Sequence, residues 1–70
     1  MEIRNEEHAR EMIKQWQNLP VPARKKEISL AMEQLELSTM YYEQKGNENG
    51  AERSARCHSL LREHLSSLEE

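Results

Sequence analysis

The sequence predicts an all-α fold, with one helical domain over residues 1–70. The first reason is that the chain holds only two glycines and two prolines, gathered at a few points, so long stretches contain no helix breaker. The second reason is that the β-branched and aromatic residues favoured in strands are scarce, with one valine, one threonine and no phenylalanine. The third is that apolar residues recur at spacings of three and four, which is the repeat of a helix face.

A first helix is predicted over about residues 5–18. Asn5 is a good N-cap, and the two glutamates after it complement the positive end of the helix dipole. Pro20 ends the segment, because the residue before a proline is pushed out of the helical region. We expect Trp16, the only tryptophan, to anchor this helix in the core; the alternative is a contact for a partner.

A second, long helix is predicted over about residues 22–45, since Pro22 suits the first helical turn and Gly46 is the next breaker. At 1.5 Å per residue it is ~36 Å long. Residues 46–50 are expected to form a loop. A third helix then follows over about residues 50–67, with Asn49 and Glu52 resembling a capping box.

The second helix carries apolar residues on two opposite sides. One side is an ordinary core stripe that includes Ile28 and Leu35, whereas Leu30, Leu37 and Tyr41 lie on the other. Either this helix lies between the other two in a bundle, or the second side meets another chain, most simply a second copy in a homodimer. A third alternative is a helical hairpin that folds only when bound. In each case we expect the second side to be buried, because exposing it forfeits several kcal/mol in a domain of marginal stability.

Charge and cysteine content limit the function classes. The formal net charge of −3 gives no overall attraction to nucleic acid or anionic lipid. No apolar run approaches the ~20 residues that span a bilayer, so we expect no membrane insertion. With one cysteine, Cys57, an intrachain disulfide is impossible, and without a secretion signal a reducing cytoplasm is the expected location.

Cys57, His58 and His64 are the first candidates for a metal site or a nucleophilic site. Cys57 and His64 are two helical turns apart, ~10 Å along the axis, which is too far for one ion. The same separation denies Cys57 a base, and the chain has neither a glycine-rich phosphate loop nor a paired-carboxylate site. We therefore expect no metal, no cofactor and no enzymatic activity.

Arg24, Lys25 and Lys26 form a basic run at the start of the second helix. Three interpretations stay open for this candidate basic patch: a solvated face with intramolecular ion pairs, a contact for an acidic protein, or a contact for DNA phosphates. The sequence thus favours a non-enzymatic protein–protein interaction module, a homodimeric accessory or regulatory factor. The alternatives are a small DNA-binding regulator and a subunit that is stable only within a larger complex.

Overall fold

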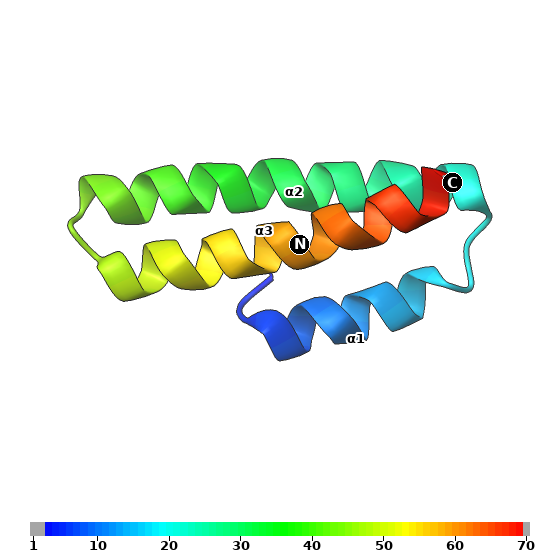
Figure 1. The fold of residues 1–70 in the computed structure, drawn as a ribbon, viewed down its shortest axis with the longest axis horizontal. Helices are drawn as coiled ribbons and strands as arrows, with labels where there is room; N and C mark the ends of the chain where they lie inside the picture. The colour runs from blue at the N-terminus through cyan, green and yellow to red at the C-terminus, as the bar shows by residue number, and fades with distance from the viewer. Residues whose placement is uncertain (1–2, 70) are drawn as a thin grey trace.

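The computed structural model describes residues 3–69, which form three α-helices: α1 (Glu6–Trp16), α2 (Val21–Gln44) and α3 (Glu48–Glu69). The helices α2 and α3 make an antiparallel hairpin, and α1 lies beside α3 along only the half of the hairpin where α2 begins (Figure 1). The principal extents are 39 × 18 × 18 Å. The predicted all-α class and the three predicted helices are confirmed.

The arrangement with α2 between the other two helices is wrong, because α3 occupies that place. Both α2 and α1 pack chiefly against α3, and Figure 1 shows α3 in the middle of the molecule. The apolar residues of α3 cover enough of its circumference to pack against both α2 and α1. Cys57 and Leu61 are buried, and three further leucines are partly buried around them: Leu60, Leu65 and Leu68.

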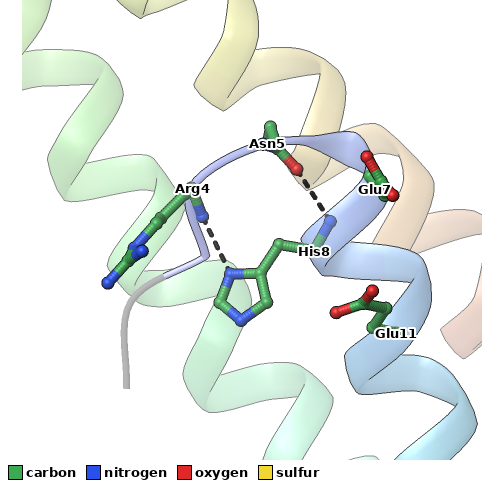
Figure 2. Close-up of a pocket in the computed structure, with 5 residues that line it drawn as sticks. All are labelled: Arg4, Asn5, Glu7, His8 and Glu11. Carbon is green, nitrogen blue, oxygen red and sulfur yellow. Dashed lines mark hydrogen bonds between the residues drawn. The ribbon is translucent and has the colours of Figure 1, made fainter.

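The start of α1 is closed by two hydrogen bonds of His8, one to Asn5 and one to Arg4, drawn in Figure 2. Asn5 Oδ1 accepts from the His8 amide at 2.8 Å, which confirms the predicted N-cap. His8 Nδ1 in turn accepts from the Arg4 amide at 3.1 Å. At its other end α1 stops at Trp16, two residues before the prediction, because the next three amides bond to carbonyls three residues back and tighten the chain into a turn.

The connection between α2 and α3 is shorter than predicted. Gly46 has a φ of +73°, and the amides of Gly46 and Asn47 donate to carbonyls of the last turn of α2, which is a Schellman motif. Asn47 Oδ1 then accepts from the Gly50 amide at 2.9 Å, so Asn47 caps α3, which begins at Glu48. The predicted 46–50 loop and the capping box at Asn49 are therefore wrong. Asn47 bonds to the last turn of α2 through its amide and caps α3 through its side chain.

The core is a single cluster to which all three helices contribute. Trp16 is only 4% exposed, which confirms its predicted role as a core anchor. The other buried apolar residues are Ile3, Ala9, Met12, Ile28, Ala31, Leu35, Cys57 and Leu61. Thr39, whose hydroxyl donates to the Leu35 carbonyl at 2.8 Å, continues the buried side of α2 toward the hairpin turn.

Candidate functional site: an exposed apolar face of α2

A strip of large apolar side chains runs along the outer side of α2. Leu30, Leu37, Met40 and Tyr41 are 48%, 65%, 56% and 57% exposed. We call these four residues the α2 strip. It contains the three residues predicted as a partner interface, and within residues 3–69 no other helix covers them, so the alternative in which this chain buries both sides of α2 is wrong.

The contrast between Leu35 and Leu37 shows how sharply the two sides of α2 differ. The two residues are two positions apart, and successive residues on a helix turn by ~100°, so their side chains point to nearly opposite sides. Leu35 is 3% exposed in the core, whereas Leu37 is the most exposed large apolar residue of α2. The strip stays open because α3 packs on the side that carries Leu35.

A shallow groove of about 300 Å³ borders the strip along the middle of α2, on the side where Trp16 ends α1. Its wall on one side is Trp16, and its remaining residues come from α2: Glu27, Leu30, Ala31, Glu33, Gln34 and Leu37. The groove therefore combines apolar walls with carboxylate and amide groups that can accept hydrogen bonds. This combination suits an amphipathic side chain with an apolar body and a polar tip.

The other end of the strip is held by aromatic contacts. The rings of Tyr41 and Tyr42 meet edge to face, with centroids 5.6 Å apart. The Lys45 ammonium lies 5.8 Å from the Tyr41 centroid, and the Arg53 guanidinium lies 5.9 Å from that of Tyr42. Below Tyr42, Gly50 leaves so little room that an added Cβ would sit 2.7 Å from the ring. Tyr41 is thus exposed to solvent and held in place by its neighbours Tyr42 and Lys45.

The three residues of the candidate basic patch point in different directions. They are consecutive on α2, so their side chains leave the helix ~100° apart. Arg24 is partly buried and its Nε donates to the Leu19 carbonyl at 2.9 Å, which ties the α1–α2 connection to α2. Lys25 is half-buried and Lys26 is exposed. Arg24 thus has a structural contact that accounts for it, and nucleic-acid binding stays a prediction.

Cys57 and the histidines lie in separate surroundings. Burial raises the pKa of the Cys57 thiol; the Glu6 carboxylate raises it further, and Arg53 and Arg56 oppose the shift. His58 Nε2 lies 3.1 Å from Glu36 Oε1 on α2, and His8 belongs to the cap of α1. Within residues 3–69 no three His, Cys, Asp or Glu side chains lie close enough together to hold a metal ion.

Two residues gain roles that the sequence did not indicate. Met40 joins the strip although it lies at the edge of the predicted line; its position three residues after Leu37 is the signal that could have found it. The spacing of Arg56 four residues after Glu52 predicts an ion pair within α3 and nothing beyond that helix. The Arg56 Nε lies 2.9 Å from Glu6 Oε1, which links α3 to α1, and its guanidinium also pairs with Glu52 at 3.8 Å.

Comparisons with protein families, curated proteins and solved structures found no significant match. None of the helices in the described range is at once long enough and apolar enough to cross a membrane.

Proposed function

We propose that this protein is a non-enzymatic protein–protein interaction module, a homodimeric accessory or regulatory factor of the cytoplasm that needs no cofactor. The observation that supports this function is the α2 strip, where four large apolar side chains stand half exposed on one side of the longest helix. Methionine and tyrosine are enriched at protein interfaces, and an apolar patch on one face marks a site of interaction.

The strength of such a contact follows from the exposed side chains. Covering the exposed half of one large apolar side chain contributes ~1–1.5 kcal/mol, so two strips together supply ~8–12 kcal/mol. Loss of translational and rotational freedom costs at least ~4 kcal/mol, which leaves ~4–8 kcal/mol. This range corresponds to dissociation constants from about millimolar to about micromolar. The homodimer is therefore reversible and responds to protein concentration, as a regulatory factor requires.

Sedimentation equilibrium from ~10 µM to ~1 mM, the range set by these affinities, tests the proposal. We expect the mass to rise from that of one 8.3 kDa chain toward that of two. Leu37→Glu should keep its helix content in circular dichroism but stay monomeric, because a carboxylate would be desolvated on association. Ser29→Glu adds the same negative charge at an exposed position off the strip. It is the matched control and should dimerise like the unaltered chain.

Three results would contradict the proposal. Equal masses for Leu37→Glu and the unaltered chain would remove the strip from the interface. Binding to arbitrary duplex DNA that weakens steeply with salt would favour the DNA-binding regulator, since phosphate contacts release counterions. A purified chain that is monomeric and largely unfolded would favour a subunit that folds only within a larger complex.

A further inference from the structure

We infer that the α2 strip pairs with the α2 of a second copy in antiparallel orientation, so that Tyr41 of each copy enters the groove beside Trp16 of the other. The inference rests on the proposed function and specifies its partner and geometry. Three independent features of α2 lead to it: residue spacing, charge distribution and the position of the groove.

Spacing first shows that the outer side of α2, which carries three of the four strip residues and Gln34, is suited to another helix. Leu30, Gln34, Leu37 and Tyr41 follow one another at intervals of four, three and four, which is the repeat along the seam of two paired helices. When a second α2 runs antiparallel in this register, Leu30 lies opposite the partner's Tyr41, and Gln34 lies opposite the partner's Leu37. Glu27 then lies opposite Gln44 of the partner subunit, next to the partner's Lys45.

Charge distribution selects the antiparallel orientation. The half of α2 over residues 21–32 has three cations and one glutamate, a net charge of +2 (3 − 1), whereas residues 33–44 have three glutamates and no cation, a net charge of −3 (0 − 3). A parallel pair would place like-charged halves together and Glu27 against its own copy. An antiparallel pair places each basic half beside an acidic half, and it also pairs the helix dipoles favourably.

The groove matches the same orientation. α1 accompanies only the half of the hairpin where α2 begins (Figure 1). The groove beside Trp16 is lined by residues 27–37 of α2, so it contains Leu30 at one end of the strip, whereas Tyr41 lies beyond it at the other end. In an antiparallel pair, the groove end of each strip lies beside the Tyr41 end of the partner's strip, so the same contact forms twice. The ring of Tyr41 then packs on the exposed side of Leu30, next to Trp16, and its hydroxyl comes within reach of Glu27 and Gln34, which line the groove.

Disulfide crosslinking under mild oxidation tests the orientation. In a Cys57→Ala background we compare Glu27→Cys, Gln44→Cys and the double variant Glu27→Cys/Gln44→Cys. Positions 27 and 44 are ~25 Å apart along one helix, so they cannot bridge within a chain. We expect the double variant to form covalent dimers at least tenfold more than either single variant, because only the antiparallel pair places position 27 beside position 44.

The outcomes separate this inference from the proposed function. Efficient dimers of Glu27→Cys alone would mean a parallel pair and would overturn the inference while leaving the homodimer intact. A sedimentation mass of a dimer with no crosslink in any variant would place the interface elsewhere and also overturn it. A mass of one chain at every concentration, again with no crosslink, would refute the homodimer itself.

Discussion

Gly50→Ala tests the close contact that sets the α2–α3 hairpin and supports Tyr41. The added Cβ would lie 2.7 Å from Tyr42 Cδ1 and 2.8 Å from Cγ, against ~3.5–4.0 Å for an ordinary carbon contact. These atoms are at the end of the ring that is attached to Cβ, so the side chain cannot easily move them away and the helices themselves must shift. Overpacking of this kind costs ~1–3 kcal/mol.

A helix preference opposes this cost, since alanine is favoured over glycine in a helix by up to ~1 kcal/mol. We therefore expect Gly50→Ala to lower the free energy of unfolding by ~1–2 kcal/mol, and each kcal/mol lowers Tm by ~4–8 °C in a domain of this size. Urea unfolding followed by circular dichroism gives the free energy directly.

In the matched control, the effect of Gly50→Ala on the free energy of unfolding is expected to change sign. In a Tyr42→Ala background the ring atoms are absent, so adding Gly50→Ala should leave only the helix preference and stabilise the chain by up to ~1 kcal/mol. If Gly50→Ala has the same effect in both backgrounds, the glycine–tyrosine contact does not limit the approach of α2 and α3, and the reasoning is refuted.

Three further predictions concern the cap, the ion pair and the thiol. Asn47→Ala should cost ~1 kcal/mol in urea unfolding and Asn49→Ala less than ~0.5, and equal losses would contradict the assignment of the cap to Asn47. A double-mutant cycle with Glu6→Gln and Arg56→Met should give a coupling of ~0.2–1 kcal/mol that shrinks in 1 M salt, because both side chains are substantially exposed; coupling that survives salt would argue against an ion pair. Burial raises the pKa of Cys57 in the folded state, so its contribution to stability is complete below the ordinary value of 9.0 and is lost as pH rises above it. The unaltered chain should therefore lose stability relative to Cys57→Ala above pH 9.0 in urea titrations, and a constant difference up to pH 11 would contradict the shift.

Much of the candidate site could be predicted from the sequence because a helix turns its residues by a constant angle. That angle alone separates Leu35 from Leu37, and it placed Leu30 and Tyr41 on the side of Leu37. It could not show that these residues lie outside the packing of the chain, since the same two-sided pattern suits a central helix. Exposure depends on where the other helices pack, which no local pattern records.

The misplaced cap of α3 has a different physical cause, which is competition between local signals of similar strength. Asn47 and Asn49 are both good caps for a following helix, and the Schellman turn at Gly46 decided between them by bringing Asn47 to the start of α3. Arg56 has a partner four residues before it on its own helix, so its link to Glu6, 50 residues away in the chain, could not be inferred from spacing.

By itself the sequence determined that the chain is all-α, that breakers at residues 20 and 46 divide it into three helices, and that α2 has two apolar sides. These properties depend on backbone preferences and on the helical repeat, which act over a few residues. Only the tertiary structure decided that α3 lies between α2 and α1, and that the α2 strip stays open while the opposite side forms the core. The reason is that α1 has 11 residues against 24 in α2, and its single buried face packs chiefly on α3, so it leaves the outer side of α2 uncovered.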